Sequence, residues 1–225
     1  MHGVMKIWTL LLKEFTIEFR NKSVVGSLVL YVIATVFLIY ITLAQQGAEK
    51  DLEVKHWNIF MWMVALFSAV NAVARSFTQD EGGRFYYYYY MCKPEWIIGA
   101  KLMYNGLLMI VLVSLTFIAM SLMLGNPVKN MWILWLVMFL GGCSFSFLFT
   151  LISAIAVKSG SASTMTAILG FPLIIPLMIF LMKLSREAFF EVPSENFLIN
   201  LGILSIWCVM LVLLSLILFP YLWRD

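Results

Sequence analysis

Few side chains in this sequence of 225 residues have the chemistry that catalysis or metal binding requires. The two histidines, His2 and His56, fall at or beyond the ends of the long apolar stretches. The three cysteines, Cys92, Cys143 and Cys208, are far apart in the chain and form no CxxC pair. Because zinc sites and disulfide frameworks need closely spaced or paired cysteines, we interpret these three as small buried residues. The sequence therefore predicts no catalytic group and no metal site.

Two short runs resemble active-site motifs in composition only. The run GGCSFSF at 141–147 contains serines, but a serine nucleophile needs a neighbouring base, and no long apolar stretch contains an acidic residue. Small residues that let two helices approach closely explain this run better. The run VKSGSAST at 157–164 lacks the GxxxxGKS or GxxxxGKT spacing of a phosphate-binding loop and is interpreted as a turn. Any ATP that drives this protein would therefore be bound by another subunit.

Ion-coupled transport is disfavoured as well, because it normally uses ionisable side chains at the middle of the membrane. Here Lys101 and Lys183 lie near the ends of apolar stretches. We expect both side chains to extend their ammonium groups to the membrane interface.

The composition is that of a membrane protein. Hydrophobic residues make up 63% of the chain, charged residues 12%, and the mean hydropathy is +0.95, whereas about a quarter of the residues of a soluble domain are charged. The net charge of +3 is too small to indicate nucleic-acid binding. Uninterrupted apolar runs predict helices and exclude the alternating pattern of a membrane barrel. We predict an all-α polytopic membrane protein with one domain, 1–225, and six membrane-spanning helices at 24–43, 57–74, 98–124, 131–157, 162–182 and 197–223.

Residues 1–22 predict an amphipathic helix that lies in the membrane interface. Apolar side chains such as Trp8 and Phe15 recur at offsets of three and four residues, and polar side chains such as Lys13 and Arg20 follow the same spacing on the other side. A helix with a mixed polar face and an aromatic apolar face is suited to the headgroup plane. We name it the elbow helix.

The sequence RSFTQDEGGRFYYYYYMCKPEWIIGAK at 75–101 gathers charged residues between two apolar stretches. It holds four of the fifteen basic residues and three of the twelve acidic ones, around a run of five tyrosines at 86–90. Charge between two spans is often only a connecting loop, and that alternative stays open. Otherwise residues 75–100 form a cytoplasmic coupling segment, with the tyrosines at headgroup depth.

The lysines and arginines predict the orientation of the chain. With the N-terminus on the cytoplasmic side, ten of the fifteen basic residues face the cytoplasm, whereas the acidic residues divide six and six. This bias in Lys and Arg is the one that the positive-inside rule requires. Both termini are therefore predicted to be cytoplasmic, and 183–196 is predicted as an outer loop with enough apolar residues to form a short helix.

Two prolines, Pro172 and Pro176, lie within the apolar run GFPLIIPLMIF. Each removes a backbone donor and bends a helix, which a membrane span tolerates when its neighbours satisfy the freed carbonyls. The pair is a candidate hinge, and a fixed bend without motion is the alternative.

The arrangement as a whole resembles the membrane subunits of ABC-2-type exporters. The shared features are the elbow helix, six spans, a charged segment between spans two and three, and an outer segment between spans five and six. More specifically, the chain resembles the CcmB family, also called haem exporter protein B, over essentially its whole length. The residues that carry this resemblance are Arg75, Phe77 and Asp80, then Pro94, Ala100 and Lys101, and the run PLIIPLMIF at 172–180.

The resemblance implies a place in cytochrome c maturation. Members of the CcmB family are non-catalytic permeases of the bacterial inner membrane that pair with the ATPase CcmA, which binds ATP, and act with CcmC and CcmD. ATP hydrolysis is linked to haem export or to release of the haem-loaded chaperone CcmE, so haem is a candidate cargo and no cofactor is assigned to this chain. A permease that exports a lipid or another amphiphile, and a scaffold that relays ATPase motion without transport, are the alternatives.

The charges and the missing phosphate-binding loop lead us to expect an ATPase docked on the coupling segment and the elbow helix. Asp80, Glu81 and Arg84 would supply charged contacts, and two permease copies are expected because ABC ATPases work as pairs. The predicted docking surface comprises Arg75, Phe77, Asp80, Glu81, Arg84, Lys93, Pro94 and Lys101, with Trp8, Phe15 and Arg20 from the elbow helix.

Overall fold

The computed structural model describes residues 8–13, 16, 22–45, 52–78, 94–158 and 162–222. All regular structure in these residues is helical, and the six long helices coincide with the six predicted apolar stretches to within a few residues at each end. Their bounds are α2 Lys22–Gln45, α3 Val54–Thr78, α5 Pro94–Leu124, α6 Met131–Lys158, α7 Ala162–Arg186 and α8 Phe197–Leu222.

Five of the described helices, α2, α5, α6, α7 and α8, are long and apolar enough to cross a membrane. The remaining long helix, α3, is not among them. It carries Lys55, His56 and Asn58 in its first two turns and Asn71 further along. The structure therefore supports an all-helical fold with five candidate spans, and a sixth crossing by α3 stays a prediction.

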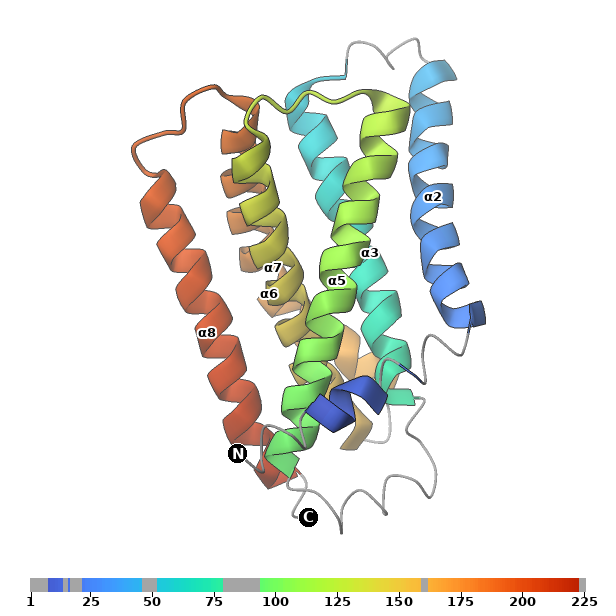
Figure 1. Cartoon of the computed structure of the whole chain (residues 1–225), viewed down its shortest axis with the longest axis vertical. Helices are drawn as coiled ribbons and strands as arrows, with labels where there is room; N and C mark the ends of the chain where they lie inside the picture. The colour runs from blue at the N-terminus through green and yellow to red at the C-terminus, as the bar shows by residue number, and fades with distance from the viewer. Residues whose placement is uncertain are drawn as a thin grey trace.

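Helix α6 lies at the centre of the bundle. In the most apolar stretch of α6, 72% of the residues are buried, whereas the corresponding value for α2 is 17%. Helix α6 contacts α3, α5, α7 and α8. Successive helices alternate in direction (Figure 1). The C-terminal ends of α3 and α8 therefore lie at the same end of the bundle as the N-terminal end of α5, and residues 8–13 lie there too. We call this the Thr78–Pro94 end. The opposite end is the η1 end, after the short 3-10 helix η1, Glu187–Phe189.

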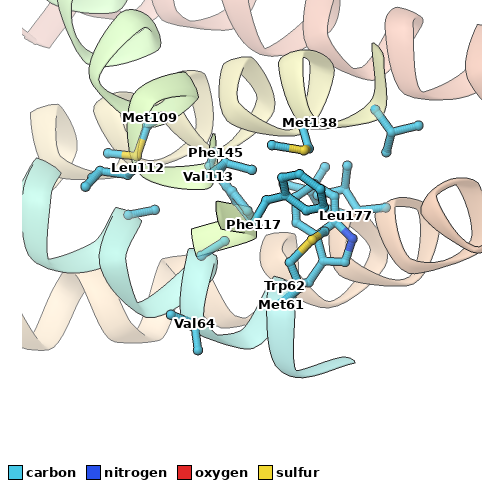
Figure 2. Packing of buried hydrophobic residues seen from close by; sticks show 14 of the residues in the cluster. Met61, Trp62, Val64, Met109, Leu112, Val113, Phe117, Met138, Phe145 and Leu177 are labelled. Carbon is cyan, nitrogen blue, oxygen red and sulfur yellow. The ribbon is translucent and has the colours of Figure 1, made fainter. Parts of the chain in front are cut away.

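Large side chains from four helices fill the space between α3, α5, α6 and α7 (Figure 2). The ring of Trp62 meets that of Phe145 edge-on with centroids 6.0 Å apart, and Phe145 stacks on Phe149 at 6.2 Å. The fully buried members of this core include Met61, Trp62, Met109, Met120, Leu134, Met138, Phe145 and Phe149.

Gly141 of α6 provides the room that Trp62 occupies. A Cβ atom at position 141 would lie 2.4 Å from Cη2 of Trp62 and 3.1 Å from Cδ2 of Leu181. The indole cannot withdraw easily, because it is fully buried and its Nε1 donates a hydrogen bond of 2.8 Å to Oγ of Ser185. The run at 141–147 therefore serves close helix contact, as its small residues predicted.

The segment at 183–196 begins with the last turn of α7 and continues through the single turn of η1. Ala188 and Phe189 are buried against the bundle, so η1 packs inward and does not lie free on the surface. The carbonyl oxygen of Ala188 accepts hydrogen bonds from the backbone N–H groups of Lys129 (3.1 Å) and Asn130 (2.8 Å) in the connection between α5 and α6. That connection turns at Gly125, whose φ of 79° favours glycine.

Replacing Gly141 by alanine should destabilise the protein, because the added Cβ collides with a ring that cannot move. Overpacking of this kind costs about 1–3 kcal/mol. Gly99 is a matched control in α5, since a Cβ there meets nothing within 4 Å. We expect Gly141→Ala to lower the melting temperature in detergent, followed by tryptophan fluorescence, and Gly99→Ala to leave it unchanged or raise it. Equal melting temperatures for the two variants would contradict this account.

Candidate functional site

The structure brings both ends of the predicted coupling segment to one end of the bundle. Arg75 and Phe77 lie in the last turn of α3, and Pro94 is the first residue of α5. Proline suits a first helical position, because the N–H group that it lacks would have no partner there. The other predicted docking residues of this segment, Asp80, Glu81, Arg84 and Lys93, and the tyrosine run at 86–90 lie outside the described residues.

The described part of the elbow helix lies at this same Thr78–Pro94 end (Figure 1). Trp8 is 58% exposed and Leu12 is 49% exposed, whereas Leu11 is buried. The hydroxyl of Thr16 donates to the carbonyl oxygen of Leu12, one helical turn earlier, at 2.7 Å. One side of this helix therefore contacts protein while its aromatic side faces outward. The predicted contacts Phe15 and Arg20 lie outside the described residues.

Lys101 differs from the sequence-based expectation. Its side chain was expected to reach the membrane interface, but it is only 3% exposed and is enclosed by protein. Lys183, at the other end of the bundle, is exposed as expected. The expectation for Lys101 was wrong because the end of a helix that starts at Pro94 is covered by its neighbours. A buried cation in an apolar helix is costly, which marks this turn of α5 as a place where the fold depends on polar contacts.

One turn beyond Lys101, a polar pair joins α5 to α6. Asn105 is fully buried, and its Nδ2 donates a hydrogen bond of 2.9 Å to Oγ1 of Thr150. Nearby, Oγ of Ser146 lies 3.4 Å from the carbonyl oxygen of Leu102. Within the described part of the chain, Oδ1 of Asn105 accepts no hydrogen bond. The pair of Asn105 and Thr150 was not predicted from the sequence, although Lys101 and Asn105 are spaced one helical turn apart in an otherwise apolar run.

A second polar cluster joins α3 to α7 near the η1 end. Asn58 donates from Nδ2 to the carbonyl oxygen of Met182 at 2.9 Å, and Oγ of Ser185 donates to Oδ1 of Asn58 at 2.7 Å. Nε1 of Trp62 donates to the same hydroxyl at 2.8 Å. Each polar atom of this triad has a partner in a buried setting. Only the asparagine at the start of an apolar stretch could have signalled it in the sequence.

The candidate hinge lies inside an unbroken helix. Pro172 and Pro176 fall in the middle of α7. Phe171 is 70% exposed, whereas Leu177 is buried against the bundle. Around the prolines, α7 therefore has one exposed side and one side that packs on the bundle. This geometry is compatible with both the hinge and the fixed bend.

The described buried polar groups join helices to one another. No group of three or more His, Cys, Asp or Glu side chains with metal-binding geometry occurs in the ranges that the structure describes. His56 is exposed and lies 3.5 Å from a carboxylate oxygen of Glu53.

Comparison with known proteins gives one family. The model of that family, described as CcmB protein, matches residues 5–218, which is nearly the whole chain and includes all of the segment at 75–101. A search of curated proteins gave no match.

Removing the Thr150 hydroxyl should destabilise the contact between α5 and α6. Thr150→Val leaves the buried amide of Asn105 without its acceptor, and hydrogen bonds between membrane helices contribute about 1 kcal/mol. In a double-mutant cycle with Asn105→Leu, the combined variant should lose less unfolding free energy than the sum of the two single variants. Ser205→Ala is the control, because the Ser205 hydroxyl donates to the carbonyl oxygen of Leu201 in its own helix. Strictly additive losses in an SDS titration would show that the two side chains do not interact.

Proposed function

The chain belongs to the CcmB family, the membrane component of the ABC system for haem export in cytochrome c maturation, and from this we propose that the segment between α3 and α5 is the docking surface for the ATPase. The chain is a multi-pass membrane protein and the permease subunit of that system. The ATPase subunit is CcmA, so nucleotide is bound and hydrolysed by a separate chain.

One observation carries the proposal. The two helices that enclose the charged segment, α3 and α5, end and begin at the same end of the bundle as the elbow helix (Figure 1). An ATPase docked at this end would contact the segment and the elbow helix together. Asp80, Glu81 and Arg84 supply the charged contacts, and the tyrosines at 86–90 lie at headgroup depth beside them.

The mechanism is a rigid-body displacement. Two ATPase subunits that close on nucleotide push the docked segment, and the push tilts the attached helices α3 and α5. Because the ATPase acts as a pair, the complex holds two copies of this chain. Helix α5 would move without bending, because buried contacts, including the hydrogen bond from Asn105 to Thr150, support it against α6. The displacement serves haem export or release of a haem-loaded CcmE-like chaperone, with CcmC-like and CcmD-like proteins as further partners.

The topology follows from the same end assignment. We propose that α3 is a sixth membrane crossing, since it runs antiparallel to α2 and α5 over its 25 residues and its Asn58 is hydrogen-bonded inside the bundle. The Thr78–Pro94 end is cytoplasmic, together with both termini, because ten of the fifteen lysines and arginines belong to that side. The membrane is the bacterial inner membrane.

Replacing two charges of the segment should weaken docking of the ATPase. Asp80→Ala combined with Arg84→Ala removes two charged contacts, which together are worth about 1–2 kcal/mol, or roughly tenfold in affinity. The measurement is the amount of ATPase that copurifies with the tagged permease at fixed salt. Lys55→Ala, an exposed charge near the η1 end, is the matched control. Unchanged copurification and ATP turnover in the double variant would remove the docking assignment.

Cysteine labelling tests the orientation. In a variant whose native cysteines are alanine, Lys93→Cys should react with a membrane-impermeant maleimide only from the cytoplasmic side. Val192→Cys, at a position that is 79% exposed near the η1 end, should react only from the outer side. Labelling of position 93 from outside would reverse the orientation.

A further inference from the structure

Helices α5, α6 and α8 enclose an apolar groove of about 420 Å³. Its α5 wall repeats at offsets of three and four residues, from Gly99 through Met103 and Gly106 to Ile110, so these residues share one side of the helix. Met103 and Leu107 on this wall are exposed. The groove therefore has protein on three sides and opens outward on the fourth. We call it the α5–α8 groove.

Two glycines of α5 create the room in the groove. A Cβ at Gly99 would meet nothing within 4 Å, and a Cβ at Gly106 would meet only Oγ of Ser146, at 3.9 Å. Larger side chains at these two positions, two helical turns apart, would fill the space in front of α6. On the α6 side the groove is lined by Cys143 and Phe147, which are both partly buried.

The lining of the groove suits a hydrocarbon and no polar ligand. Among the described residues that line it, no side chain carries a charge, an amide or a hydroxyl, and the thiol of Cys143 is the most polar group. Water does not fill an apolar cavity stably, and an empty groove would forfeit the dispersion contacts of its walls. A haem would bring two carboxylates, for which these walls offer no strong donor.

The length and the depth of the groove match one leaflet of a bilayer. From Gly99 to Ile110 the α5 wall rises by about 16 Å, which is close to half of the roughly 30 Å hydrocarbon core. The apolar part of α5 is Trp96–Leu124, so the groove begins near its start and ends near its midpoint. The α8 wall lies in the last two turns of the apolar part of that helix. The groove therefore lies in the leaflet at the Thr78–Pro94 end.

A helix, from a partner or from a second copy of this chain, is too wide for the groove. A helix with its side chains is about 10 Å across, so a segment as long as the groove would occupy about 1,300 Å³. That is three times the volume of about 420 Å³ that the groove offers. A partner helix could insert only single side chains, whereas one acyl chain can lie along the whole length.

We propose that the α5–α8 groove binds one acyl chain of a phospholipid from the leaflet at the Thr78–Pro94 end. A chain in the groove contacts α5, α6 and α8 together, so it gains more dispersion contacts than a chain that lies against the outer side of a single helix. The bound chain completes the packing between α5 and α8. This inference goes beyond the proposed function, since it requires neither docking of the ATPase nor transport.

Photolabelling with a lipid tests the site. The probe is a phosphatidylcholine with a diazirine in the middle of one acyl chain, added to vesicles that hold the full-length chain with its ATPase. Mass spectrometry after irradiation identifies the labelled residues. We expect the label to concentrate on Met103, Leu107 and Cys143. Leu30 and Ile33 of α2 should carry much less label, although they are also exposed and lie at a comparable distance from the start of their helix.

Filling the groove should displace the acyl chain. Gly106→Leu and Gly99→Leu each place a side chain in the groove, and each should remove more than half of the label from Met103 and Leu107. Gly202→Leu is the matched control in α8, because a Cβ there also meets nothing within 4 Å and the position does not line the groove. This control should leave the labelling unchanged.

Three results would overturn the site. Equal labelling of the groove and of α2 would show that lipid contacts the whole surface without preference. Undiminished labelling in both groove variants would place the chain elsewhere. Oxidative crosslinking of Met103→Cys between two copies, with the native cysteines replaced by alanine, would show that a second copy covers the groove. If Gly106→Leu proves unfolded by its melting curve, Gly99→Leu and the label map of the unsubstituted protein decide.

Discussion

The position of Trp62 decides how three helices of this bundle meet. Its indole ring occupies the space that a Cβ at Gly141 would need, and its N–H group donates to Ser185. Helices α3, α6 and α7 are therefore fixed in distance and in register by one side chain. The core around Phe145 is built on this contact. An apolar side chain at position 62 could fill space, but it could not select one register of α7.

Two polar clusters add the specificity that apolar packing lacks. Lipid chains and leucine side chains are equally apolar, so burial in lipid does not distinguish one helix pairing from another. Asn105 with Thr150 fixes α5 against α6, and Asn58 with Ser185 fixes α3 against α7. Each pair would leave a buried polar atom unsatisfied if its helices slipped by a turn. The clusters sit in different halves of the bundle, so they set its register at two depths.

The same contacts suit the role of a permease that works with a separate ATPase. The CcmB family supplies the membrane component of its ABC system, and the chemistry of ATP hydrolysis belongs to another chain. The buried asparagine, serine and threonine side chains of the permease join helices to one another.

The sequence by itself determined the helices, the charged segment and the family. Apolar runs of sufficient length exclude any other structure in lipid, so the helix bounds followed to within a few residues. Residues of the charged segment and the proline-rich run led to the CcmB family, which the family model confirms over 5–218. These features depend only on local composition and order.

Only the tertiary structure decided which side of each helix is buried. These helices are apolar around their whole circumference, because one side faces lipid and the other faces the core, so periodicity carries little information. The burial of Lys101 was therefore missed, and so was the central place of α6. The bond between Asn58 and Ser185 joins residues 127 positions apart. Such a contact exists only once three helices have closed around Trp62, and no local pattern encodes that closure.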